Sequence, residues 1–217
     1  MSRPYVKTYR ICAGIIGLLA VLGVVLQFNS AIPMFIKNGR STAGAMVDFF
    51  SYFTIQTNIL VAIALGVMAL TRINNSNFFK RPGVVTALAA YISIVCLVYN
   101  LVLRPLTHYT GIAKLGDELV HSIVPVLFII YWLTAVLKET ITWKDTLTWL
   151  WYPFFYLVYI IIRGALTGLY PYFFVDVTRF GYPKVLFNSA ILLIIFLIFS
   201  LLYVAIARGI QRTHKAL

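Results

Sequence analysis

The chain is poor in charged residues, and acidic residues are the scarcest of them. Charged side chains make up 11% of its 217 residues, with 6 Asp+Glu against 18 Lys+Arg. Soluble domains carry about 25% charged residues, so these are too few to cover a soluble domain. The residues are 61% hydrophobic and 16% aromatic. We therefore expect an all-α polytopic membrane protein, with residues 1–217 forming a single transmembrane domain.

Cysteine and histidine are scarce as well. Cys12 and Cys96 are the only cysteines, and both lie inside apolar segments. A disulfide framework or a thiolate metal site is therefore not expected. We predict that both cysteines are small buried apolar side chains. Of three histidines, only His121 lies in an apolar segment. Bis-histidine haem ligation and a zinc or di-iron cluster are disfavoured, and we expect no metal and no cofactor.

The basic excess gives a formal net charge of +12. In a soluble protein such a charge would suggest nucleic acid as a partner. Here the basic residues lie mainly at the ends of apolar segments, where they anchor a protein to anionic lipid heads. We expect membrane lipids or a lipid-like ester as partners and no nucleic acid; the oligomeric state is left open.

Six apolar runs are long enough to cross a ~30 Å hydrocarbon core as helices. The first follows a basic start, as in a signal peptide, but it is too long and no clear cleavage site follows. The loop 31–45 contains Pro33 and Gly39, which favour irregular structure. The predicted helices span residues 11–28, 46–70, 84–103, 117–137, 147–169 and 185–207.

Six spans place both termini on one side of the membrane. The tails and the loops on that side hold 11 Lys and Arg residues, against 6 in the opposite loops. This bias predicts that both termini are cytoplasmic. The family resemblance described below implies that the membrane is a prokaryotic cell (inner) membrane.

Polar side chains enter the second apolar segment at helical spacing. Asp48, Ser51, Thr54 and Asn58 fall near one helix face, where lipid tolerates few polar groups. Such a polar stripe needs partners from other helices. We predict that Thr54 on this stripe faces His121 in the fourth helix.

The predicted topology gives these polar residues a depth. Thr54 would lie ~10 Å below the outer boundary and His121 ~6 Å below it. Asn100, Arg163 and Asn188 would end at similar levels on three other helices. We therefore expect one buried polar pocket that opens toward the outer leaflet.

Arg163 must find acceptors inside the membrane, because a guanidinium is always charged. It can reach the outer interface, or it can pair with Asp48, Asp117 or a bound carboxylate or phosphate. Tyr156 and Tyr159 lie near the same helix face. Their rings are expected to line the pocket or to fill the core.

This set of residues suits acyl transfer. Thr54 would attack an ester carbonyl after His121 takes its proton, and His121 would then protonate the leaving alcohol. No residue that would orient His121 is evident, and Asp48 and Asn58 are the candidates. The predicted oxyanion or substrate-binding residues are Arg163, Asn100, Asn188, Asn58, Tyr156 and Tyr159.

Structural explanations remain open for the same residues. A Thr in a membrane helix commonly bonds the carbonyl one turn earlier, and His121 taken alone can be a packing residue. The whole polar layer would then hold helices together in a structural or assembly subunit.

The segments Tyr52-Phe53-Thr54-Ile55-Gln56-Thr57-Asn58 and Leu119–Leu127, which contains His121 and Pro125, carry a family resemblance. In these motifs, and in length and helix count, the chain resembles a prokaryotic six-transmembrane family. That family is distantly similar to the androgen-induced and androgen-dependent TFPI-regulating proteins. Those proteins are intramembrane threonine hydrolases of fatty acid esters of hydroxy fatty acids. The resemblance implies Thr54 as the nucleophile and His121 as the base.

Two alternatives accompany this hypothesis. Thr57 lies three residues beyond Thr54 and becomes the nucleophile if the register shifts. The chain can also be a non-catalytic carrier or sensor, in which Arg163 binds the acidic head of an amphiphile and the tyrosines line the slot for its tail.

Overall fold

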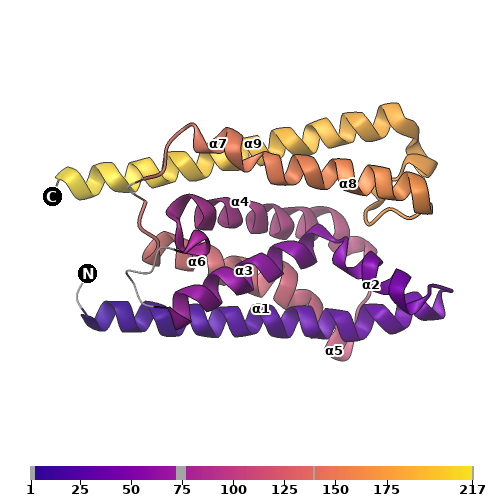
Figure 1. The fold of residues 1–217 in the computed structure, drawn as a ribbon, viewed down its shortest axis with the longest axis horizontal. Coiled ribbons are helices and arrows are strands. Elements are labelled where there is room, and N and C mark those ends of the chain that lie inside the picture. Colours follow the sequence, from indigo (N-terminus) through magenta and orange to yellow (C-terminus); the bar gives the residue numbers. More distant parts are fainter. Residues whose placement is uncertain (1–2, 72–76, 139, 217) are drawn as a thin grey trace. The chain divides into compact units, whose positions relative to one another are not determined.

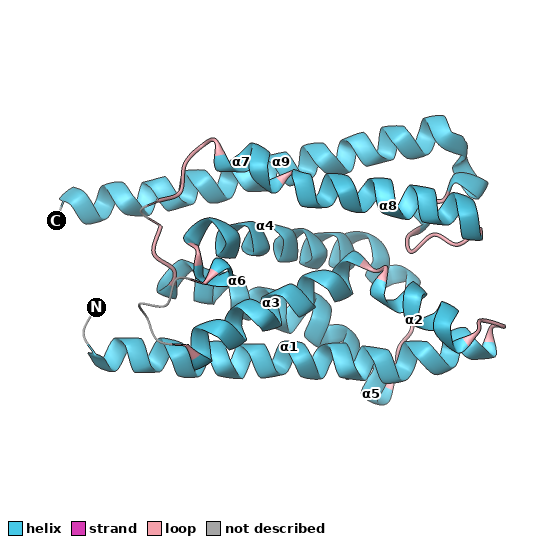
Figure 2. Cartoon of the chain, in the orientation of Figure 1, coloured by secondary structure: helices cyan, strands magenta, loops and turns pink. Residues whose placement is uncertain are grey.

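The computed structural model describes the backbone of residues 3–71, 77–138 and 140–216, and the side chains of residues 7–71, 77–138 and 140–212. These residues are almost entirely helical and form no strand (Figure 2). Six stretches among them are long and apolar enough to cross a membrane, which confirms the predicted all-α polytopic fold. These spans are Lys7–Lys37, Phe53–Leu70, Pro82–Leu106, Gly111–Ala135, Asp145–Thr167 and Val177–Arg212.

The contacts divide the chain into two compact units, residues 1–137 and 138–217 (Figure 1). In the first unit the helices are α1 (Arg3–Lys37), α2 (Thr42–Phe50), α3 (Phe53–Leu70), η1 (Phe78–Lys80), α4 (Pro82–Val98), η2 (Tyr99–Leu103), η3 (Arg104–Leu106), α5 (Gly111–Glu118), η4 (Leu119–Ile123) and α6 (Val124–Ala135). In the second unit they are α7 (Asp145–Trp149), α8 (Trp151–Thr167), η5 (Phe173–Val175) and α9 (Val177–Ala216).

The predicted loop 31–45 is mostly helical. Helix α1 continues through Pro33 to Lys37, and α2 begins at Thr42 after Ser41, whose Oγ accepts a hydrogen bond from the Gly44 amide. Ile32 is buried in a cluster with Ala45, Phe49 and Ile55. Burial of these apolar side chains outweighs the backbone hydrogen bond that a proline removes from a helix.

The predicted second helix, 46–70, is interrupted at its start. Helix α2 ends at Phe50, and α3 begins at Phe53 after Tyr52, which is in an extended conformation. Thr54 is therefore the second residue of α3 rather than the ninth residue of one continuous helix. The fourth span begins at Gly111, so His121 lies ten residues along it rather than four.

Close helix contacts in the first unit depend on glycines of α1 and α5. A Cβ on Gly23 would meet the Val120 side chain at 2.9 Å, and one on Gly116 would meet Cβ of Leu26 at 2.8 Å. Small residues of this kind let membrane helices approach closely. The approach brings η4, which carries His121, against α1.

In the second unit, glycines end one helix and break another. Gly168 closes α8 in the left-handed conformation, with φ 71°. The ring of Tyr170 then covers Gly164, where any side chain would collide with it. Gly181 has φ 72° and ψ 161° and interrupts α9 just before Pro183, so the apolar part of α9 starts near the predicted sixth helix.

Replacing Gly116 tests the contact between α1 and α5. We expect Gly116→Ala to lower the free energy of unfolding by about 1–3 kcal/mol, because the new methyl group meets Leu26 Cβ and backbone atoms of α1. The measurement is thermal or denaturant unfolding of the purified protein in detergent. Gly66→Ala in α3 is the control, since nothing lies within 4 Å of its added Cβ. Equal stability of the two variants would contradict the packing described.

Candidate active site

Two π-helical turns of the first unit lie together. η2 follows α4, and η4 joins α5 to α6. Turns of this type are rare, insert one extra residue into a helix and occur frequently at functional sites. The rings of Tyr99 in η2 and His121 in η4 stack, with centroids 3.8 Å apart and planes within 11° of parallel. This stacking holds the imidazole plane of His121.

His121 is oriented by the residue one turn earlier. Its Nδ1 lies 3.0 Å from the Asp117 backbone oxygen and 3.0 Å from Oδ1 of the Asp117 carboxylate. A carbonyl oxygen can only accept, so Nδ1 must be the protonated nitrogen. In the neutral ring Nε2 then carries the lone pair, and no described residue forms a hydrogen bond with it. His121 is therefore arranged as a base through Nε2.

Asp117 is itself held in place. It is buried, and its other carboxylate oxygen accepts a hydrogen bond from the Tyr99 hydroxyl. That hydroxyl also lies 3.2 Å from Oγ1 of Thr107. Asp117 thus orients His121. The sequence alone suggests Asp48 or Asn58 for this role. A signal was present in the sequence, since Asp117 and His121 are four residues apart and share a helix face.

An ion pair closes one edge of this network. Nη2 of Arg104 donates to Glu118 Oε2 at 2.6 Å and to Ser122 Oγ at 3.0 Å. The Arg104 guanidinium carbon also lies 5.4 Å from the centre of the Tyr99 ring. The two π-helical turns are therefore tied together by charge as well as by stacking.

Asn100 lies at the same edge. Its amide nitrogen donates to the Cys96 backbone oxygen at 2.8 Å and lies 3.5 Å from Ser122 Oγ. Asn100 in η2 therefore reaches the residue after His121 in η4, and its shortest bond is to its own helix. Its predicted role at the oxyanion remains a prediction.

Thr54 is connected to η4 through Asn58. The fully buried amide nitrogen of Asn58 donates to the Thr54 backbone oxygen at 2.9 Å and to the Val120 backbone oxygen at 3.0 Å. Both amide hydrogens are used, so Asn58 joins α3 to η4 rather than orienting His121. The Thr54 side chain is buried at 7% exposure. Within the described residues no hydrogen bond joins Thr54 to His121.

Thr57 lies on the same helix next to Asn58. Its Oγ1 and the Asn58 Oδ1 are buried and have no hydrogen-bond partner among the described residues. Buried polar atoms without partners are uncommon and costly in proteins. These two atoms near η4 are therefore able to form further hydrogen bonds. Thr57 remains an alternative nucleophile.

The polar stripe expected along one helix does not continue through α2 and α3, because the chain bends between them. Asp48 lies in α2 and pairs with Arg40, with oxygen–nitrogen distances of 2.6 and 3.1 Å. Ser51 donates to the Val47 backbone oxygen at 2.6 Å. Asp48 therefore forms an ion pair near the start of α2.

The remaining predicted residues belong to the second unit. Arg163 is buried, and its Nη1 lies 3.4 Å from the Leu169 backbone oxygen. Asn188 donates to the Phe174 backbone oxygen at 2.8 Å. Tyr156 is buried, whereas Tyr159 is 42% exposed. Their convergence with Thr54 and His121 remains a prediction.

No group of three His, Cys, Asp or Glu residues gathers in the part of the chain that the structure describes. Cys12 and Cys96 are half-buried free thiols. Comparison with protein-family models, with curated proteins and with solved structures finds no match to this chain.

Replacing Asn58 tests the link between α3 and η4. We expect Asn58→Leu to cost about 1–3 kcal/mol of unfolding free energy, because the buried Val120 carbonyl loses its donor. Unfolding in detergent, followed by tryptophan fluorescence, measures the change. Asn38→Leu, at an exposed position after α1, should leave stability nearly unchanged. An Asn58→Leu variant with the unfolding free energy of the wild type would show that the hydrogen bond to Val120 does not stabilise the fold.

Proposed function

We propose that this protein is an intramembrane hydrolase of a lipid ester, such as a fatty acid ester of a hydroxy fatty acid. The observation that carries the proposal is the hydrogen bonding of His121. Its Nδ1 donates to Asp117, its ring stacks on Tyr99, and Nε2 is left to act as a base. A neutral imidazole held in one tautomer by a carboxylate is the arrangement that activates hydroxyl nucleophiles. The six apolar spans support a substrate drawn from the membrane.

The reaction proceeds in two balanced steps. Nε2 of His121 takes the proton of the Thr54 hydroxyl while Oγ1 bonds to the ester carbonyl carbon. The tetrahedral intermediate expels the alcohol oxygen, which receives the proton from His121, and an acyl-threonine remains. Water then attacks this ester with His121 again as base, which releases the fatty acid and restores Thr54.

The surroundings of Thr54 support negative charge in these steps. Thr54 is the second residue of α3, and the start of a helix is the positive end of its dipole. Asn100 would add a donor for the oxyanion, and the substrate-binding roles expected of Arg163, Asn188, Tyr156 and Tyr159 stay predictions. Asn58 acts through the backbone bridge to Val120.

Topology completes the proposal. The excess of basic residues on one side predicts cytoplasmic termini, and with them a position of Thr54 toward the outer half of a prokaryotic cell membrane. The ester would enter laterally from the lipid.

A non-catalytic carrier or sensor for an amphiphile is the second candidate. The burial of Arg163 on α8 favours it, because an inward guanidinium can hold an acidic head group. In that case amphiphile binding survives Thr54→Ala and disappears with Arg163→Met. Loss of ester turnover in Thr54→Ala, with binding kept, favours the hydrolase instead.

Covalent labelling tests the proposed nucleophile. We expect a fluorophosphonate probe to label the wild type in detergent, and we expect Thr54→Ala and His121→Ala each to abolish labelling. Thr57→Ala is the matched control on the same helix and should keep it. The opposite pattern, with labelling lost only in Thr57→Ala, would move the reaction to Thr57. Labelling unaffected by all three substitutions would refute a threonine hydrolase.

Asp117→Asn tests the orientation of His121. We expect kcat for a lipid ester to fall about 100-fold with little change in KM, because a neutral amide no longer stabilises the imidazolium that forms when His121 takes the proton. Tyr99→Phe keeps the ring stack and removes one donor to Asp117, so its effect should be much smaller. An Asp117→Asn enzyme with wild-type kcat would contradict the positioning role.

A further inference from the structure

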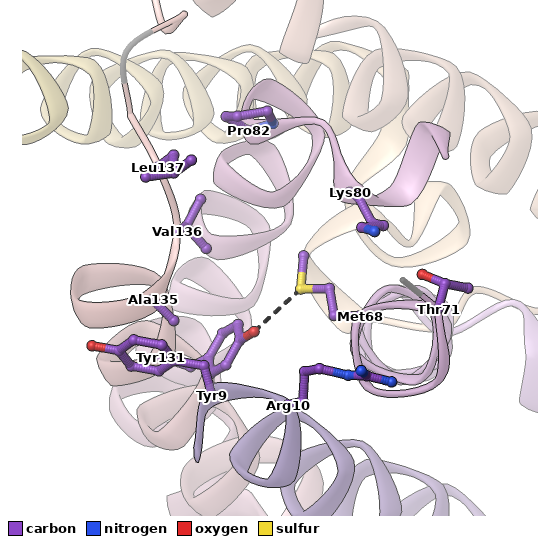
Figure 3. A pocket seen from close by; sticks show the side chains of 10 residues that line it. All are labelled: Tyr9, Arg10, Met68, Thr71, Lys80, Pro82, Tyr131, Ala135, Val136 and Leu137. Atoms are coloured by element: carbon purple, nitrogen blue, oxygen red, sulfur yellow. Dashed lines mark hydrogen bonds between the residues drawn. The ribbon is translucent and has the colours of Figure 1, made fainter. Parts of the chain in front are cut away.

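The first unit contains a cavity of about 300 Å³ far from His121. It lies among the start of α1, the last turn of α3, the start of α4 and the end of α6 (Figure 3). His121 lies instead beside the last residues of the α4 region, roughly 25 Å away along that helix at ~1.5 Å per residue. The cavity is therefore separate from the candidate active site.

The wall of the cavity is mainly apolar, with polar groups at a few points. Met68, Tyr131 and residues 135–137 form apolar surface, whereas Arg10, Thr71 and Lys80 bring polar ends to it. The Tyr131 hydroxyl lies 3.5 Å from Met68 Sδ (Figure 3). Apolar walls with few convergent polar groups are typical of sites for small amphiphilic ligands.

Arg10 is held in a fixed position at this cavity. Its Nε and Nη2 donate to the Ala69 backbone oxygen at 3.0 and 2.8 Å. A guanidinium has five N–H donors, so the Nη1 edge and one Nη2 hydrogen remain. The acceptor is a neutral carbonyl, and the positive charge of Arg10 therefore lacks a negative partner among the described residues.

The acidic residues of the first unit are engaged elsewhere. Residues 1–137 contain only Asp48, Asp117 and Glu118 as carboxylates. Asp48 pairs with Arg40, Asp117 binds His121, and Glu118 pairs with Arg104. All three lie at the end of the unit that carries His121, so the Arg10 end has a fixed cation and no carboxylate of its own unit.

We propose that this cavity binds the phosphate of an anionic phospholipid head group. Arg10 supplies the planar donor pair that suits phosphate oxygens, Lys80 adds a second positive charge, and the apolar wall contacts the first methylenes of the lipid. Basic pockets between membrane helices on the cytoplasmic side hold anionic lipid heads in this way. The Lys and Arg bias predicts that this end of the unit faces the cytoplasm. The proposal does not depend on the hydrolase.

Lipid binding to the full chain in neutral detergent tests the proposal. We expect phosphatidylglycerol to raise the melting temperature and to be retained in native mass spectra, whereas phosphatidylcholine is not. Arg10→Gln should weaken phosphatidylglycerol binding about tenfold or more. Lys7→Gln is the matched control, because it removes one positive charge from an exposed position one turn earlier on α1.

A second variant separates ligand loss from misfolding. Ala135→Phe places a ring in the cavity and leaves the bond between Arg10 and Ala69 intact, so it should also exclude phosphatidylglycerol. Equal stabilisation by both lipids, or wild-type binding by Arg10→Gln and Ala135→Phe, would overturn the proposal. An equal shift with inorganic phosphate alone would also overturn it, in favour of a site for the free anion.

Discussion

Polar side chains inside a membrane must find their hydrogen-bond partners within the protein, because lipid offers none. In the first unit this constraint gathers them around two π-helical turns. Asp117 binds His121 and Tyr99, and Arg104 binds Glu118 and Ser122. The bonds of buried Asp117 satisfy a carboxylate that would otherwise be costly to bury. The same bonds fix the plane and the protonated nitrogen of His121, so the stability of the fold and the chemistry of the site share one set of contacts.

The two ends of the first unit differ in charge for the same reason. Its three carboxylates lie at the His121 end, each with a basic partner. The other end holds Arg10 against a neutral carbonyl and Lys80 at an apolar cavity. One end is a closed polar network, and the other suits an anion supplied from outside. This asymmetry also agrees with the distribution of Lys and Arg that predicts the topology.

The six spans were predictable, because long apolar runs suffice to identify them. The break between α2 and α3 was not, since neither Gly nor Pro marks Ser51 or Tyr52 and the bend accompanies the Arg40–Asp48 pair. Pro33 predicts the end of a helix, yet α1 continues through it because Ile32 is buried. The roles of Thr54 and His121 are predictions from polarity and resemblance. Asp117 was detectable by its spacing from His121, whereas the Tyr99 stack is a tertiary contact that no local pattern indicates.

The protonation of the His121 ring nitrogens tests the account most directly. The protein has three histidines, so nitrogen-15 spectra of the histidine-labelled protein contain the signals of three imidazole rings. The signals that disappear in His121→Asn belong to His121. At a pH where the ring is neutral, the account predicts a proton on Nδ1 and a bare Nε2. A proton on Nε2 in the wild type would contradict it, because His121 could not then act as the base.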